Sequence, residues 1–206
     1  MDWNRYNKLM RHYLQQEIKD FVSFIIHELN VDYHARILEL GCGSGWVTLE
    51  LARRLPEATV IGLDQNPELT KIACQNKQAE NLTNVDFVHS VAESFNIFSA
   101  RPFDVVIAFK VFHQWINPVP VLNEIERILK KNGKFAITDY RKDLKLLARA
   151  ALWFSARTMP KDFRHDWKKM FDNSHPVNEV LKLFLQSHLK DWKLRTTLLD
   201  YLIFKD

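Results

Sequence analysis

The sequence is poor in cysteine, in glycine and in long apolar runs, and each shortage excludes a class of protein. Two cysteines in 206 residues are too few for a disulfide framework or a four-cysteine zinc site, so we expect no metal centre and a reducing compartment. No run of about 18 apolar residues is present, which argues against a membrane-spanning helix. Residues 1–6 contain no apolar segment of the kind found in a secretory signal, so we predict a cytoplasmic protein.

The composition and length are those of one globular domain. Apolar residues make up 47% of the chain and charged residues 26%. A chain of this length can bury a large core, and a division into two independent cores is not expected.

The charge is unevenly distributed along the chain. Residues 1–140 carry 15 Lys and Arg against 17 Asp and Glu, whereas residues 141–206 carry 14 against 8, so the net charge of +4 comes from the C-terminal third. Such a region can meet a nucleic acid, an anionic substrate or a membrane surface. Because its basic residues are scattered, we favour a solvated helical face.

Hydrophobic periodicity and turn signals predict alternating helices and strands. The first 30 residues are expected to be helical, and the last segment, residues 192–205, is expected to be a hairpin. Asn66 is predicted to cap a helix and Gly133 to end one in a left-handed conformation. Between the two terminal segments, strands are expected at residues 36–40, 58–64, 85–89, 103–109 and 134–140. Helices are expected at residues 46–54, 67–80, 121–131, 143–159 and 162–189, the last two with interruptions at Pro160 and Pro176.

This alternation predicts an α/β domain with a mostly parallel sheet covered on both faces. Five strands and the terminal antiparallel hairpin make seven strands. We treat residues 1–206 as a single domain. Its expected parts are an N-terminal helical cap at residues 1–30, a core at residues 31–140, a helical cap insertion at residues 141–189 and the hairpin at residues 190–206.

Three of the five glycines, Gly41, Gly43 and Gly45, directly follow the first predicted strand. Glycines at alternate positions allow a tight turn, and the free N–H groups of the next helix favour an anionic group. A dinucleotide fingerprint would need glycine where Trp46 stands, and no Gly-Lys-Ser/Thr triplet of a Walker loop follows. The spacing therefore favours a smaller anion, such as an amino-acid carboxylate.

Asp64 ends the second predicted strand. In parallel sheets, ligands bind beyond the carboxyl ends of the strands, where a carboxylate can accept hydrogen bonds from both hydroxyls of a ribose. A nucleoside that carries an amino acid satisfies the loop and the acid together, and S-adenosylmethionine is such a molecule. The alternative is that Asp64 only caps the end of its strand.

These features belong to a set of five motifs that resembles the class I S-adenosylmethionine-dependent methyltransferases. The likeness covers roughly residues 30–140 and is closest to the small-molecule branch that includes enzymes of the ubiquinone and menaquinone biosynthesis type. It implies a Rossmann-like fold whose core at residues 31–140 binds the cofactor. The motifs are Ile37–Gly45, Val60–Asp64, Val91–Glu93, Phe103–Val106 and Leu129–Lys134.

The resemblance implies roles for the residues of the first motif. Gly41, Gly43 and Gly45 shape the pocket for the methionine part of the cofactor, and Cys42 fills the loop between them. Glu39 organises the loop or reaches the amino group through water. A buried acid satisfied by loop amides is the competing interpretation of Glu39.

By the same resemblance, the later motifs contact the nucleoside part of the cofactor. Many relatives carry Asp at the position of Val91, so adenine recognition here rests on backbone and packing, or on Glu93 as a substitute. The implied contacts are Asp64 with the ribose, Gln65, Ala92 and Glu93 with the adenine, and Phe109 and Lys110 with the sulfonium side.

His113 follows the fourth predicted strand and is our candidate catalytic residue. An imidazole at the mouth of the site can take a proton from a substrate hydroxyl or amine, although it can also merely cap the next turn. Asp139, Tyr140 and Arg141 end the fifth predicted strand and are candidates to face the substrate.

We therefore predict an S-adenosylmethionine-dependent methyltransferase that transfers a methyl group to a small organic acceptor by in-line displacement. The aromatic residues of the caps favour such an acceptor, and no nucleic-acid-binding module is visible. A macromolecular acceptor (tRNA or protein), a nicotinamide-dependent reductase and a non-catalytic partner subunit are the alternatives. The acceptor atom and the oligomeric state are not defined by the sequence.

Overall fold

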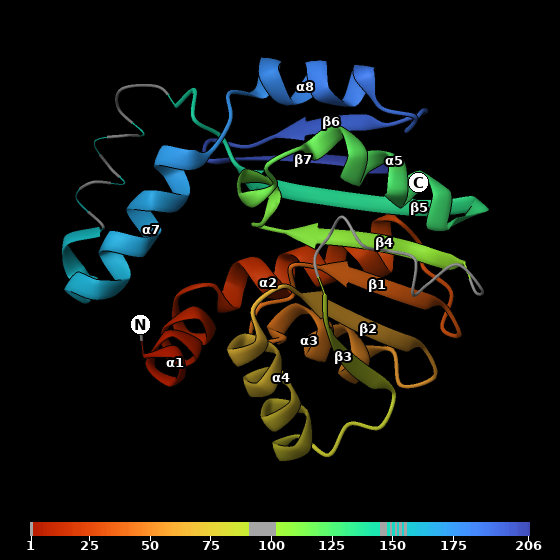
Figure 1. Ribbon diagram of the computed structural model, residues 1–206, viewed down its shortest axis with the longest axis horizontal. Coiled ribbons are helices and arrows are strands. Elements are labelled where there is room, and N and C mark those ends of the chain that lie inside the picture. Colours follow the sequence, from red (N-terminus) through yellow and green to blue (C-terminus); the bar gives the residue numbers. More distant parts are fainter. Residues whose placement is uncertain are drawn as a thin grey trace.

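The computed structural model describes residues 2–90, 102–144 and 148–206, apart from residues 149, 151, 153 and 155. Its centre is a seven-stranded sheet in the order β3-β2-β1-β4-β5-β7-β6 (Figure 1). The strands are β1 (Arg36–Leu40), β2 (Thr59–Asp64), β3 (Val85–His89), β4 (Phe103–Phe109), β5 (Leu129–Tyr140), β6 (Lys193–Thr196) and β7 (Asp200–Lys205).

The first five strands are parallel, and the two C-terminal strands are antiparallel. β1 pairs with β2 and β4, β2 pairs with β3, and β4 pairs with β5, all in parallel register. β7 lies antiparallel between β5 and β6 and forms the predicted hairpin with β6. The fold class predicted from the sequence is confirmed.

Helices cover both faces of this sheet (Figure 1). Within the described ranges, no helix is long and apolar enough to cross a membrane. The helices are α1 (Trp3–Tyr13), α2 (Gln15–Ser23), α3 (Trp46–Arg54), α4 (Pro67–Ala79), α5 (Pro118–Ile128), α7 (Lys161–Asn173) and α8 (Val177–Gln186), with a π-helical turn at Phe24–Glu28 and 3₁₀ turns at Phe112–Gln114 and Ala156–Thr158.

Two apolar clusters, one on each face of the sheet, form the core. Leu38 and Val106 belong to the cluster that packs on α5 and α8, whereas their neighbours Ile37 and Val105 belong to the cluster that packs on α2 and α3. Successive side chains of a strand point to opposite faces, so a strand covered on both sides is apolar at consecutive positions. This explains the uninterrupted apolar runs of the central strands.

The start of α4 agrees with the sequence, but the end of α5 does not. The Asn66 side chain accepts hydrogen bonds from the backbone N–H groups of Glu68 and Leu69, as expected of an N-cap. The predicted helix over residues 121–131 in fact ends at Ile128, because Leu129 is extended and pairs with Phe103 of β4.

The prediction that Gly133 adopts a left-handed conformation is therefore wrong. Gly133 lies inside β5, and the described glycines with positive φ are those of the loop after β1. A Cβ atom at Gly133 would lie 2.9 Å from the Lys130 carbonyl oxygen. Glycine is needed there for a close backbone approach beside the shift of register in the β4–β5 pair.

The predicted helix over residues 143–159 falls partly outside the described residues. Where the structure describes its last part, the 3₁₀ turn at Ala156–Thr158 is present. The helical segment predicted over residues 162–189, with its interruption at Pro176, is confirmed: it forms α7 and α8, and Pro176 directly precedes α8.

Candidate functional site

The loop between β1 and α3 is shaped by three glycines with left-handed backbones. Gly41, Gly43 and Gly45 have φ values of +67°, +54° and +87°. A Cβ atom at Gly41 would lie 2.3 Å from Cγ2 of Val111, whereas one at Gly43 would meet nothing within 4 Å. Gly41 is thus fixed by packing as well as by conformation, and Gly43 borders open space in front of the loop.

That open space is part of a cavity of about 340 Å³ at the carboxyl ends of the parallel strands. Figure 1 places α1 and α7 at this edge of the sheet. Trp3 and Tyr6 of α1 and Met170 of α7 line the cavity. The predicted site residues that line it are Glu39, Gly41, Cys42, Gly43, Asp64, Gln65, Phe109, Lys110 and His113.

Three predicted contacts are not part of this lining. Ala92 and Glu93, like Val91, lie outside the described residues. Gly45 instead allows α3 to approach β3, because a Cβ atom there would lie 2.6 Å from Cζ of Phe87.

Asp64, the last residue of β2, is hydrogen-bonded to the glycine loop. Its Oδ2 accepts a hydrogen bond from the Gly43 N–H at 2.7 Å, and its Oδ1 accepts one from the Asn66 N–H at 2.8 Å. Burial raises the pKa of this carboxyl, and the backbone donors act against that rise. The carboxylate thus lies at the cavity wall with its orientation fixed by two backbone groups.

Glu39 lies beneath the same loop and is almost completely buried. It accepts a hydrogen bond from the Thr48 hydroxyl, and burial raises the pKa of its carboxyl to about 7. Burial also raises the pKa of the Cys42 thiol well above its ordinary value. A buried neutral thiol is a poor nucleophile, which supports the interpretation of Cys42 as a filler of the loop.

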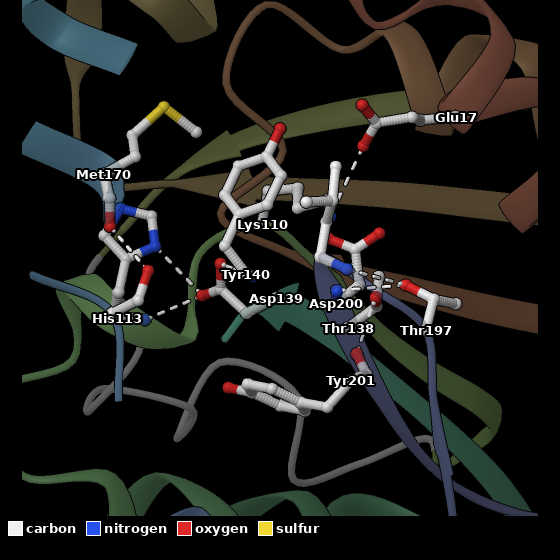
Figure 2. A network of polar contacts seen from close by, with 12 residues as sticks. Glu17, Lys110, His113, Thr138, Asp139, Tyr140, Met170, Thr197, Asp200 and Tyr201 are labelled. Atoms are coloured by element: carbon white, nitrogen blue, oxygen red, sulfur yellow. Dashed lines mark hydrogen bonds and ion pairs between the residues drawn. The ribbon is translucent and has the colours of Figure 1, made fainter. Parts of the chain in front are cut away.

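Lys110 follows β4 with a positive φ of 54° and is held inside the protein. Its ammonium group forms ion pairs with Glu17 of α2 and Asp200 of β7 and lies 3.8 Å from the centre of the Tyr140 ring (Figure 2). Burial raises the pKa of Glu17 despite the nearby ammonium group. Lys110 therefore joins the N-terminal helices to the C-terminal hairpin at the edge of the cavity.

His113 lies on Asp139, which is fully buried (Figure 2). The backbone N–H of His113 donates to Asp139 Oδ2 at 2.9 Å, and His113 Nδ1 lies 2.9 Å from the same oxygen. The other carboxyl oxygen accepts from the Tyr140 N–H at 2.7 Å. A carboxylate only accepts hydrogen bonds, so this network assigns the proton to Nδ1 and leaves Nε2 as the basic nitrogen.

The three candidates at the end of β5 thus have different environments. Asp139 lies beneath His113, and the Tyr140 ring stacks on Phe171 with centroids 4.3 Å apart. Arg141 forms an ion pair with Asp143. None of the three candidates is among the residues that line the cavity. The partners of Lys110 and the residues contributed by α7 were not predicted, since no local spacing in the sequence encodes them.

Comparisons with known proteins agree with this geometry. A family model described as a methyltransferase domain matches residues 32–200. The ubiquinone biosynthesis O-methyltransferase of Xylella fastidiosa (strain M23) is 26% identical over 79% of this chain and 75% of its own length. The malonyl-[acyl-carrier protein] O-methyltransferase of Halalkalibacterium halodurans is 31% identical over 52% of this chain, which spans 40% of that relative.

Solved structures show the same fold at low identity. A putative S-adenosyl-L-methionine-dependent methyltransferase from Methanococcus maripaludis matches 98% of this chain and 90% of its own with a TM-score of 0.76 and 18% identity. The plantazolicin methyltransferase BpumL in complex with SAH matches 98% of this chain and 86% of its own with a TM-score of 0.75 and 17% identity.

Proposed function

Because this chain belongs to the methyltransferase domain family, we propose that it transfers the methyl group of S-adenosylmethionine to a hydroxyl group of a small organic acceptor. The family confirms the resemblance seen in the sequence motifs, as well as the enzyme class and the cofactor that it implied. The observation that carries the proposal is that the glycine loop, Asp64 and His113, which Asp139 holds from behind, line one cavity.

The cavity suits the cofactor. The left-handed loop leaves open space at Gly43, and the N-terminal end of α3, which directly follows the loop, suits the carboxylate of an amino acid. Asp64 and Gln65 both line the cavity; in the proposed complex Asp64 accepts hydrogen bonds from the ribose hydroxyls and Gln65 lies beside the adenine. Glu39 is bonded to Thr48 of α3 and lines the same cavity. Phe109 also lines it and lies on the sulfonium side in the proposed complex. When bound, the cofactor supplies an activated methyl group on a sulfonium.

His113 acts as the base on the acceptor side of the cavity. The acceptor oxygen forms a bond to the methyl carbon while the bond from that carbon to sulfur breaks, and the hydroxyl proton moves to His113 Nε2. Asp139 holds the imidazole in the required tautomer. A carboxylate acceptor would need no base, so the His113–Asp139 pair favours a hydroxyl.

The size of the acceptor follows from the walls of the cavity and from the relatives. Trp3, Tyr6 and Met170 line the cavity in front of the loop, and a small acceptor bound against them would displace water from the reacting groups. The two relatives from Xylella fastidiosa and Halalkalibacterium halodurans are named as O-methyltransferases, and the comparisons give no support to a tRNA acceptor or to a non-catalytic role. A cytoplasmic location belongs to the same proposal.

The proposal is tested in two steps with the purified chain. Calorimetry is expected to show one site for S-adenosylmethionine and one for S-adenosylhomocysteine. A panel of phenols, alcohols and carboxylic acids is then incubated with methyl-labelled cofactor, and transfer is expected to hydroxyl compounds. The His113→Gln variant is expected to retain cofactor affinity and to lose about 10²-fold or more of the transfer rate. Absence of cofactor binding, or transfer that is unaffected in this variant, would contradict the proposal.

A further inference from the structure

A second cavity, of about 720 Å³, lies against α7. The residues that α7 contributes to it recur at three- and four-residue spacing and therefore share one face of the helix. They are Arg164, Trp167, Lys168, Phe171 and Asp172. Lys169, Met170 and Asn173, which line the cofactor cavity, lie on the other face. Helix α7 thus separates two cavities, and the second has no part in the proposed methyl transfer.

The wall of this second cavity is apolar and firmly supported. Trp167 packs edge-on against Phe171 with ring centroids 4.6 Å apart, and Phe171 stacks on Tyr140 at the end of β5. Leu144 and Leu152 add aliphatic surface. Volumes of about 300–1,000 Å³ with predominantly apolar walls and a few polar groups are typical of sites for small organic molecules.

The charged groups around this apolar wall are mostly of one sign. Among the side chains that the structure describes, Lys142, Arg157, Arg164 and Lys168 line the cavity together with one acid, Asp172. Lys142 Nζ donates to the backbone carbonyl of Asp172 at 3.0 Å, so its charge is not neutralised by that contact. The excess of positive charge favours an anion.

Arg164 gives a second, independent indication. One of its terminal nitrogens, Nη2, donates to the Met159 carbonyl oxygen at 3.3 Å. Its Nε is buried and has no hydrogen-bond partner in the described part of the chain. Leaving a buried guanidinium N–H without a hydrogen-bond acceptor costs free energy. A carboxylate or sulfate oxygen is the acceptor that best matches the planar guanidinium group.

We propose that this second cavity binds an organic anion with an apolar body: its hydrocarbon part lies against Trp167 and Phe171, and its anionic group lies against Arg164 and Lys168. The ligand is a single small molecule, distinct from the cofactor. The contact of Phe171 with Tyr140, whose ring lies against Lys110, connects the second cavity to the edge of the first.

The test uses octanoate, with octan-1-ol and octylammonium as neutral and cationic probes of the same length. Calorimetry on the full chain is expected to show one octanoate per chain, bound at least about tenfold more tightly than either other probe. The Arg164→Gln/Lys168→Gln double variant is expected to lose about tenfold or more of the octanoate affinity. The matched double variant Lys131→Gln/Lys182→Gln removes the same charge from exposed positions elsewhere and is expected to bind octanoate normally.

Ala150 lines the same cavity and is exposed, so Ala150→Trp fills the space without burying a new side chain in the core. This variant is also expected to lose octanoate binding. Calorimetry with S-adenosylmethionine on the same samples checks the fold and separates this inference from the proposed function. Equal affinity for octanoate and octan-1-ol, wild-type binding by the Arg164→Gln/Lys168→Gln variant, or no binding of octanoate to the wild-type chain would overturn the inference.

Discussion

Asp139 accepts two hydrogen bonds from His113 on a single carboxyl oxygen, one from the backbone N–H and one from Nδ1. Its other oxygen accepts from the Tyr140 N–H. All three of these groups donate, so the side chain between them must accept hydrogen bonds on both of its oxygens. This arrangement fixes both the position and the tautomer of the imidazole.

The first prediction concerns Asp139→Asn. An amide has one donating and one accepting end, so it can satisfy either His113 or Tyr140 but not both. We expect kcat to fall by about 10²-fold or more, with cofactor affinity nearly unchanged and a changed dependence of kcat on pH. Steady-state kinetics over a pH series and calorimetry with S-adenosylhomocysteine measure these effects. Asp143→Asn, at a half-exposed ion pair near the end of the same strand, is the matched control. An equal loss of kcat in both variants would contradict the positioning role of Asp139.

The second prediction concerns Asp64→Ala. The change removes an acceptor from the Gly43 N–H and, in the proposed complex, from the ribose hydroxyls. We expect cofactor binding to weaken by about 1–3 kcal/mol, because hydrogen-bonding groups are left without partners. Calorimetry measures the change. Asp86→Ala, which removes an exposed acid from the neighbouring strand β3, is expected to leave the affinity unchanged. An unchanged affinity in Asp64→Ala would contradict the ribose role.

The third prediction compares alanine at two glycines of the loop. Both positions have positive φ, which costs an L-residue about 1–2 kcal/mol. Gly41→Ala also drives a Cβ atom into Val111, whereas Gly43→Ala meets open space. We expect Gly41→Ala to lower the free energy of unfolding by about 1–3 kcal/mol more than Gly43→Ala. Urea unfolding measures both, and the Val111→Ala change is expected to recover part of the difference in Gly41→Ala.

The sequence was sufficient to predict the sheet and the cofactor loop because both depend on local signals. Apolar runs defined the strands, and alternate glycines before a helix defined the loop. Asp139 and His113 were each singled out, but their contact was not, since spacing along the chain does not give the separation of two strand ends. The ion pairs of Lys110 with Glu17 and Asp200 depend on how the N-terminal helices and the hairpin pack, and no local pattern encodes that packing.

The prediction for Gly133 was wrong for a similar reason: a contact between distant segments overrides a local signal. An Asn-Gly pair after an amphipathic run is a strong local signal for the end of a helix. Here the pairing of Leu129 with Phe103 starts β5 before that signal is reached. A tertiary contact thus determined the boundary.

The last prediction concerns the pH dependence of stability and Glu39. Burial raises the pKa of this carboxyl from an ordinary value of 4.5 to about 7 in the folded protein. Between these two values the folded chain holds a proton that the unfolded chain has released. The free energy of unfolding therefore falls as the pH rises through this window, by about 3 kcal/mol in total from this group. The raised pKa of Asp64 acts in the same direction.

Glu39→Gln keeps an acceptor for the Thr48 hydroxyl but does not titrate. We expect this variant to lose most of the decline in stability between about pH 5 and pH 7 and to be more stable than the wild type at pH 8. Urea unfolding at pH 5, 6, 7 and 8 measures the slope. Glu57→Gln, at an exposed acid, serves as the control and is expected to keep the wild-type slope. A wild-type slope in Glu39→Gln would show that this carboxyl is ionised throughout the range, and the folded protein would then have to stabilise a negative charge beneath the glycine loop.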